Sequence, residues 1–481
     1  MPTDDPNLDD PNLLATAVPP EPPAALNPPF QVGDPNRPII LEQGVVHYLR
    51  ADVAAQAETC ISLEWLPSPS IRLTSRDIPY DNIRSMGIFR SIFEGLGEVT
   101  LRLNDGTDIP DQALFVERMS NTPKGSLVAW GGQIRARVIR PRPGPVSMVD
   151  FLLPNFADPH GRPINYPNGG SAAARSELMG DGWRVTLDEV SEEGQVRSEL
   201  RAKSGYGVTH VGRIERVDGK TFSVENADEV LNLLAWYFTF VAGRWTGPFL
   251  PVGYDANGHR AWEAWDCRRV EPFRFRQSWL QTRDADSFSA PFAGFVARWS
   301  DPVWRDVIQT AIHWHTEANK QSGSIEGAIV LTQTAFELLA SAVLVETEGW
   351  VSQDGFDRLP AEDRIRLLFR WANIPTSIPD VCDQLAALAK AENWSDGPRA
   401  MTGVRNTITH PTKKNREKFD RHTDDARVEV WTLGLWALEL CLLRLFNYQG
   451  RYSCRLRQQH PWEAEIVPWN PPLSTDHAAS K

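Results

Sequence analysis

The strongest constraint on the fold is a change of hydrophobic periodicity along the chain. From about residue 39 to residue 250, short runs of alternating or β-branched residues are separated by turn signals, which is typical of strands. From about residue 295, apolar residues recur every three or four positions over long stretches, which indicates amphipathic helices. A chain of 481 residues also exceeds what one hydrophobic core usually supports. The sequence therefore predicts an α+β protein with a β-rich N-terminal domain and an all-α, bundle-like C-terminal domain.

Three segments of the N-terminal domain carry the clearest strand signals, namely residues 61–65, 99–103 and 133–139. The second is followed by Asn-Asp-Gly at 104–106, a sequence that favours a hairpin turn. We expect one β-rich sensor or regulatory domain over residues 39–285.

One segment of this domain has the pattern of a helix instead. Residues 227–241 are strongly apolar, and Asn226 or Asp228 can cap such a helix at its start. Gly243 follows directly, as expected just beyond a helix end. We therefore expect a closing helix that ends before Gly243.

The C-terminal domain is expected to span residues 295–455 and to contain four or five helices. Their predicted ranges are 299–320, 324–346, 358–371, 377–409 with a break at 396–398, and 423–447. The loops between them are short and polar, which favours antiparallel neighbours in a bundle.

Both ends of the chain lack apolar periodicity. Residues 1–38 are rich in proline and acidic side chains, the composition of a disordered tail, and residues 456–481 are expected to form an extended tail. The N-terminus has neither the basic region nor the apolar region of a signal peptide. The most apolar segment is 428–446, but it contains Glu429, Glu439 and Arg444, so we expect a buried helix and no membrane span there. We expect a cytoplasmic protein with no membrane partner.

The overall charge argues against a protein that coats nucleic acid through a basic surface. The chain has a formal net charge of −12, so any contact with nucleic acid must be local. The five cysteines are widely spaced, without a CxxC pair, and predict no zinc framework. We expect neither a metal nor a cofactor.

The segment 404–411 carries the residues best suited to chemistry. Asn406 and His410 are four residues apart, so on a helix they lie on one face and the amide can orient the imidazole. A histidine at a helix C-terminus is suited to proton transfer, and an arginine such as Arg405 can neutralise charge on a phosphorane. RNA cleavage without a metal needs both of these functions.

A basic run follows this segment directly. Residues 405–421 contain six basic side chains against two acidic ones, a local formal charge of +4 in an acidic protein. Such a run would attract a phosphate backbone. We expect Lys413, Lys414 and Arg416 to contact RNA, although basic runs are usually only a solvated face.

The pattern Arg-Asn-x-x-x-His at 405–410 resembles the Arg-polar-x-x-x-His motif of the HEPN superfamily. Together with the segments 329–339 and 431–452, it resembles the consecutive helices of ApeA-like HEPN domains. This resemblance implies a homodimer formed through the helical domain, in which two motifs meet in one cleft. It also implies a metal-independent endoribonuclease that leaves 2′,3′-cyclic phosphate ends, often as a prokaryotic antiphage or toxin effector.

The same resemblance assigns roles to individual residues. Arg405 takes the motif arginine, Asn406 the polar position and His410 the motif histidine. Some HEPN families add an acidic residue on an earlier helix, a position that Glu337 can fill. A phage or host trigger would then be sensed by the N-terminal domain.

Three alternatives stay open at this point. Arg405 can simply pair with a carboxylate while Asn406 and His410 terminate a helix, and Glu337 can be an ordinary salt-bridge partner. The helical domain can also be a non-catalytic scaffold that binds RNA, a nucleotide or a protein. The β-rich domain can hold an independent enzyme, although no diagnostic constellation of Asp, Glu, His or Ser is present there.

Overall fold

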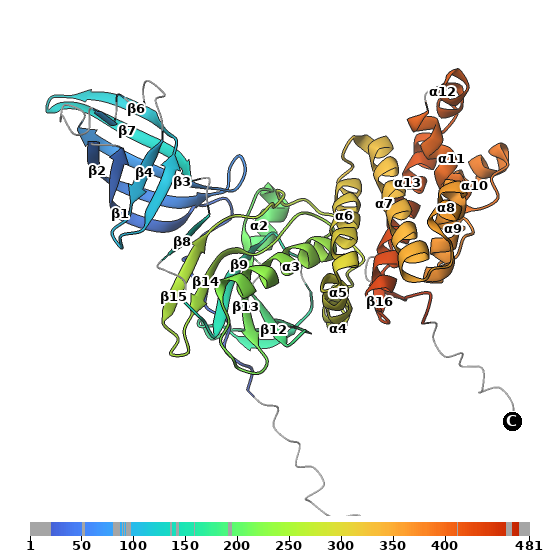
Figure 1. Cartoon of the computed structure of the whole chain (residues 1–481), viewed down its shortest axis with the longest axis horizontal. Helices are drawn as coiled ribbons and strands as arrows, with labels where there is room; N and C mark the ends of the chain where they lie inside the picture. The colour runs from blue at the N-terminus through green and yellow to red at the C-terminus, as the bar shows by residue number, and fades with distance from the viewer. Residues whose placement is uncertain are drawn as a thin grey trace, which may run out of the picture.

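The protein consists of two antiparallel sheets followed by a helical unit. The computed structural model describes residues 21–50, 53–79, 87–88, 90, 92, 98–134, 137–140, 144–157, 159–190, 195–410, 412–457 and 464–470. In Figure 1 the first sheet (blue), the second sheet (green) and the helices (yellow to red) follow one another along the longest axis. The predicted α+β class, with the β-rich region before the helices, is confirmed.

The first sheet has seven strands in the order β5-β4-β1-β2-β3-β7-β6. The predicted turn at 104–106 joins β4 to β5 as an antiparallel hairpin. The strands are β1 Ile39–Arg50, β2 Val53–Glu64, β3 Ser70–Pro79, β4 Val99–Arg102, β5 Asp108–Gln112, β6 Leu114–Thr122 and β7 Gly125–Ile134.

The second sheet has eight strands in the order β10-β11-β12-β13-β9-β14-β15-β8. Helix α2 (Gln195–Lys203) precedes β13, and helix α3 (Val224–Ala242) follows it. The strands are β8 Val138–Arg140, β9 Met148–Pro154, β10 Arg162–Asn165, β11 Ser171–Gly180, β12 Trp183–Glu189, β13 Val208–Arg216, β14 Phe249–Tyr254 and β15 Arg260–Trp265.

The two faces of the second sheet pack against different partners. Because side chains alternate along a strand, Phe151 and Leu153 of β9 share a core with α3, whereas Leu152 joins the core of the first sheet. The single β-rich domain expected over 39–285 is therefore two sheets with two cores. Alternation predicts which side chains are buried, but it does not predict which strands pair, and so the division could not be seen in the sequence.

The cap of α3 differs from the expected one. Ser223 is the N-cap residue: its hydroxyl accepts a hydrogen bond from the Asn226 backbone, and the two residues form a capping box. Asn226 therefore supports the cap from the third helical position, and Asp228 lies inside the helix. The predicted end is confirmed, since Gly243 adopts the left-handed conformation with φ 63°.

The helical unit begins earlier and contains more helices than expected. Two short helices precede residue 300, and α12 and nearly all of α8 also lie outside the predicted ranges, whereas the range 377–409 is divided into α10 and α11 near its predicted break. The short helices α4, α5, α8 and α12 are too brief to show a periodicity of their own. The helices are α4 Ala285–Ser289, α5 Phe292–Trp299, α6 Pro302–Asn319, α7 Ser324–Ser341, the π-helical turn Ala342–Thr347, α8 Gln353–Arg358, α9 Ala361–Ala372, α10 Asp383–Glu392, α11 Gly397–Thr409, α12 Lys413–Phe419 and α13 Asp424–Leu445.

Parts of both expected tails are ordered against the folded units. The backbone N–H of Ala25 donates to the Asn165 carbonyl at 2.8 Å, and Phe30 is buried. After α13, β16 (Arg451–Ser453) pairs with β17 (Ala464–Ile466). A proline-rich segment lacks periodicity but can still pair its remaining backbone groups, so composition alone was misleading. Residues 1–20, 458–463 and 471–481 of the expected tails lie outside the described residues.

Among the described residues, one helix is long and apolar enough to cross a membrane by length and composition, and it lies outside the segment 428–446, which we expected to be the most apolar one and too charged to span a membrane. This helix comprises α7 and its π-helical turn, Ser324–Thr347, and 61% of its most apolar window is buried within the protein. Helices α6, α9, α11 and α13 all pack against α7. We therefore interpret α7 as the central core helix of the helical unit.

The helical unit and the second sheet share one continuous hydrophobic core. Buried residues of α3, α5, α6 and α13 belong to a single cluster. Gly294 of α5 lies so close to the end of α13 that a Cβ there would be 1.9 Å from the Phe446 carbonyl oxygen. The boundary near residues 285–295 is therefore a change of secondary structure within a common core.

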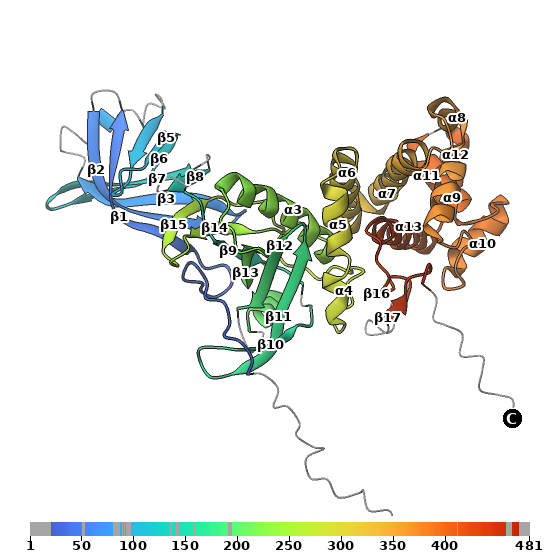
Figure 2. The ribbon, with the colours of Figure 1, turned by 60° about the horizontal axis from the view of Figure 1, so that its bottom comes forward.

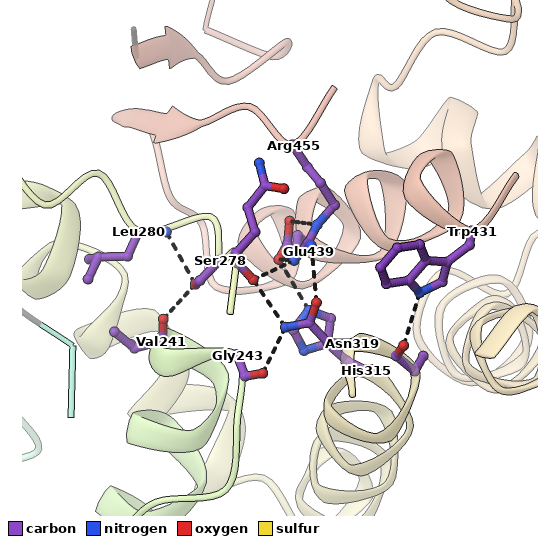
Figure 3. Close-up of polar contacts among 11 residues, drawn as sticks. Val241, Gly243, Ser278, Leu280, His315, Asn319, Trp431, Glu439 and Arg455 are labelled. Carbon is purple, nitrogen blue, oxygen red and sulfur yellow. Dashed lines mark hydrogen bonds and ion pairs between the residues drawn. The ribbon is translucent and has the colours of Figure 1, made fainter. Parts of the chain in front are cut away.

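A buried polar cluster joins the same parts (Figure 3). Arg455, which follows β16, donates to Glu439 of α13 at 2.5 Å and to Asn319 of α6 at 3.0 Å. His315 of α6 lies 3.2 Å from the same carboxylate. The backbone carbonyl of Gln277 accepts from both Arg455 and Asn319. We call Arg455, Glu439, His315, Asn319 and Gln277 the joint.

Candidate functional site

Helix α11 presents the predicted motif, and its start is set by a local signal. The Asp396 side chain accepts a hydrogen bond from the Arg399 backbone at 3.0 Å, and a proline occupies the first turn. The predicted break at 396–398 is thus the N-cap of α11. The helix ends at Thr409, and His410 leaves it with φ −117° and ψ 81°. Pro411, expected to end the turn, lies outside the described residues.

Arg405 is held in a half-buried position between two helices. Its Nη2 lies 3.8 Å from Glu337 Oε1 on α7, and its Nη1 donates to Asn406 Oδ1 at 3.1 Å. Its Nε is buried and has no hydrogen-bond partner among the described residues. Figure 2 shows α7 and α11 side by side in the helical unit. The structure therefore brings Arg405, Asn406 and Glu337 together.

Glu337 is flanked by a second arginine that the sequence did not single out. Arg364 Nη1 of α9 lies 3.7 Å from Glu337 Oε2, and Gln333 donates to Oε1 at 3.0 Å. Arg364 is itself fixed, because it donates to the carbonyls of Leu359 and Asp357. Sequence spacing could not indicate Arg364, since α9 and α7 meet only through tertiary packing.

His410 is exposed at the end of α11, and its backbone is fixed from the following helix. Its carbonyl accepts from Asn415 Nδ2 and from the Thr412 backbone, each at 2.7 Å. Asn406 was expected to orient the imidazole. Its amide oxygen accepts from Arg405, and no contact among the described residues joins the Asn406 side chain to the imidazole.

Asn415 belongs to α12, a helix whose start has a readable signal. Thr412 is its N-cap and accepts from the Asn415 backbone at 3.2 Å, so Thr-x-x-Asn at 412–415 marks the helix start. The count of charges alone indicates only a basic run here. This N-cap pattern could have predicted that Asn415 lies in the first turn of a helix that begins shortly after His410.

The basic run is partly neutralised by its surroundings. Lys413, Lys414 and Arg416 are exposed on α12, and Lys413 lies 4.0 Å from Glu417. Lys418 and Arg421 both pair with Glu392 at the end of α10. The hydrogen bond from Lys418 is the main cause that lowers the pKa of Glu392. The local surface is therefore less basic than the count of charges suggested.

The arrangement combines a positioned guanidinium with an accessible imidazole. The nearby His422 is buried, and burial lowers its pKa, so it is a poor proton carrier. A single chain thus presents one accessible histidine here, whereas cyclising cleavage needs a base and an acid. The described residues contain no group of three His, Cys, Asp or Glu side chains that could hold a metal ion.

Comparisons with known proteins match the second sheet and the helical unit. Residues 142–276 match the family described as YopA central domain, and residues 301–467 match the YopA C-terminal domain. The uncharacterized SPbeta prophage-derived protein YopA of Bacillus subtilis (strain 168) is 26% identical over 360 residues. The match covers 74% of this chain and 79% of the relative. No solved structure matches the chain.

Proposed function

We propose that the helical unit is a metal-independent endoribonuclease of the HEPN type. The observation that carries this proposal is the grouping of Arg405 with Glu337 across two helices, with His410 exposed one turn later. A carboxylate that pairs with an arginine fixes the orientation of the guanidinium and leaves it accessible to solvent. A phosphate-binding arginine needs both properties. The basic helix α12 begins three residues beyond His410 and can attract RNA.

In the proposed reaction, the 2′-oxygen of a ribose attacks the adjacent phosphorus and the bond from phosphorus to the 5′-oxygen breaks. His410 removes the 2′-hydroxyl proton or protonates the leaving 5′-oxygen, and Arg405 neutralises charge on the phosphorane. The products are a 2′,3′-cyclic phosphate and a 5′-hydroxyl. A second chain supplies the complementary histidine, so the active form is a homodimer.

The biological setting we propose is a conflict between a phage and its bacterial host, within the cytoplasm. The relative named YopA is described as prophage-derived, which supports a phage context. The two sheets would sense a phage or host trigger, and the helical unit would cut RNA.

The test is cleavage of total bacterial RNA by the full-length protein in EDTA, followed by analysis of the new ends. We expect 2′,3′-cyclic phosphate and 5′-hydroxyl ends, and a loss of about 10²- to 10⁴-fold in rate for His410→Ala. Arg405→Ala should lose activity to a similar extent.

The matched control is His259→Ala, because His259 is an exposed histidine in the turn between β14 and β15. This variant should cleave as the wild type does. If the wild type leaves RNA intact, or if His410→Ala cleaves as fast as the wild type, the nuclease proposal is wrong. Binding of RNA without cleavage would favour the non-catalytic scaffold.

A further inference from the structure

A large cavity lies where the second sheet meets the helical unit, away from the motif of α11. It has a volume of about 1080 Å³ and is lined by residues just after β9, by α2, by the end of α3, by the segment 273–282 and by the end of β16 with the residues after it. Its walls contain six arginines: Arg197, Arg201, Arg244, Arg274, Arg276 and Arg457. None of the described lining residues is Asp or Glu.

Arg244 is the most unusual of these arginines. It directly follows the cap of α3, only 6% of its surface is exposed, and its Nε has no hydrogen-bond partner among the described residues. Its Nη1 donates to the Arg274 carbonyl at 2.6 Å, and the guanidinium lies 4.4 Å from the centre of the Phe273 ring. Burial lowers its pKa to about 10, so it remains a cation at neutral pH.

A buried cation of this kind is costly unless an anion accompanies it. No carboxylate of the described residues forms an ion pair with Arg244. Glu271 attracts its charge from beyond ion-pair distance, but that carboxylate is itself paired with Lys320 at 3.1 Å. Two of the other arginines are paired, since Arg197 lies 2.9 Å from Glu189 and Arg457 lies 2.5 Å from Glu465. The remaining positive charge of the wall therefore lies on Arg201, Arg244, Arg274 and Arg276, and the last three of these come from one end of α3 and the adjoining segment 273–282.

The cavity also offers apolar and aromatic surface. Phe156, Leu200 and Leu280 line its wall, and Phe275 is 84% exposed beside Arg274 and Arg276. An exposed phenylalanine next to arginines is suited to stacking on a flat ring. The volume is that of a site for an organic ligand and far exceeds the need of one phosphate ion.

We propose that this cavity binds a nucleotide. Its phosphates would be held by Arg244, Arg274 and Arg276, whose planar forks match phosphate oxygens, and its base would stack against Phe275. This inference is independent of the proposed nuclease, because it uses none of the residues of α7, α11 or α12.

The position of the cavity connects its occupant to the helical unit. Gln277 lines the cavity, and its carbonyl accepts hydrogen bonds from Arg455 and Asn319 of the joint (Figure 3). Ser278, also in the wall, donates to the Val241 carbonyl at 2.5 Å. A bound nucleotide would thus hold together the segments that attach α6 and α13 to the second sheet.

The test is isothermal titration of the full-length protein with the four ribonucleoside triphosphates, their monophosphates, the nucleosides and pyrophosphate. We expect at least one nucleotide to bind, and its nucleoside and pyrophosphate each to bind at least about tenfold more weakly. The same nucleotide should raise the melting temperature of the whole chain.

The variants separate this site from adventitious binding. Arg274→Gln combined with Arg276→Gln, and separately Phe275→Ala, should each weaken binding about tenfold or more while leaving the melting temperature of the free protein unchanged. The control is Arg162→Gln, an arginine on β10 whose side chain is 80% exposed. The proposal is overturned if no nucleotide binds, if both cavity variants bind as the wild type does, if pyrophosphate binds as tightly as any nucleotide, or if only long RNA binds.

Discussion

At the residue scale, the candidate site depends on an ion pair between helices that are distant in sequence. Arg405 and Glu337 were both chosen from the sequence, and the structure places them 3.8 Å apart. The local pattern predicted the residues of α11 because they share one helix. Arg364 and Asn415 were missed as site residues because their roles depend on how α9 and α12 pack around that helix.

Glu337→Gln tests whether the carboxylate positions Arg405. The pair is partly exposed, so we expect the free energy of unfolding to change by less than about 1 kcal/mol. If Arg405 binds the phosphorane, kcat for RNA cleavage should fall about tenfold with a smaller change in KM. The measurements are steady-state cleavage and urea unfolding of the full-length variant.

The control for this variant is Glu417→Gln, since Glu417 is exposed on α12 and its one ion pair among the described residues is with Lys413 at 4.0 Å. Equal kcat values for Glu337→Gln and the wild type would show that Glu337 is only a salt-bridge partner. If Glu417→Gln lowered kcat as much as Glu337→Gln does, the loss would not be specific to Glu337, and the proposed role of Glu337 in positioning Arg405 would be contradicted.

At the element scale, long periodic segments were predicted well and short or irregular ones were not. Helices α6, α7 and α13 follow from their apolar stripes, and Asp396 marked the start of α11. The pairing of β8 with β15 and the docking of residues 21–38 depend on contacts between distant segments. The joint also depends on contacts between distant segments. Its residue Glu439 lies in a segment that the sequence indicated only as a buried helix.

Glu439→Gln is expected to destabilise the protein by about 3–5 kcal/mol, because it leaves the buried Arg455 without its counter-charge. Burial alone would raise the pKa of Glu439, but Arg455 and the hydrogen bond to His315 outweigh it and lower the pKa. The stabilisation is therefore complete above the unfolded value near 4.5 and is lost as the pH falls through the lower folded value.

Urea unfolding from pH 7 to pH 3 measures this contribution. The wild type should lose stability below about pH 4.5 more steeply than Glu439→Gln does. Glu346→Gln is the control, because Glu346 is an exposed glutamate of the same unit and should behave as the wild type. Parallel pH profiles for all three proteins would contradict the assigned role of the carboxylate.

At the scale of the whole molecule, the motif and the arginine-lined cavity occupy different places. The motif lies among α7, α9, α11 and α12, and the cavity lies beside the second sheet. Periodicity predicted the order of the β-rich and helical parts, but it could not predict that they share a core. A cavity between parts is likewise invisible in a sequence, because its walls come from segments distant along the chain.

The proposed composite site predicts a dimer in solution. Sedimentation of the full-length protein should give a species of about twice the chain mass of 54.0 kDa under the conditions of cleavage. Adding an excess of His410→Ala to the wild type should lower cleavage more than dilution does, because a mixed dimer has one histidine in the shared cleft where the proposed reaction needs both a base and an acid. Full activity of a strictly monomeric species would contradict the shared cleft.

The continuous core between the second sheet and the helices has a consequence for modularity. Val241 of α3 and Leu440 of α13 belong to the same buried cluster, and the joint crosses the same boundary. If a recombination event transplanted the helices alone onto another protein, each half would expose its part of the shared apolar core. Arg455 would also lose its hydrogen bond to the Gln277 carbonyl. Gene shuffling should therefore move the second sheet and the helices together.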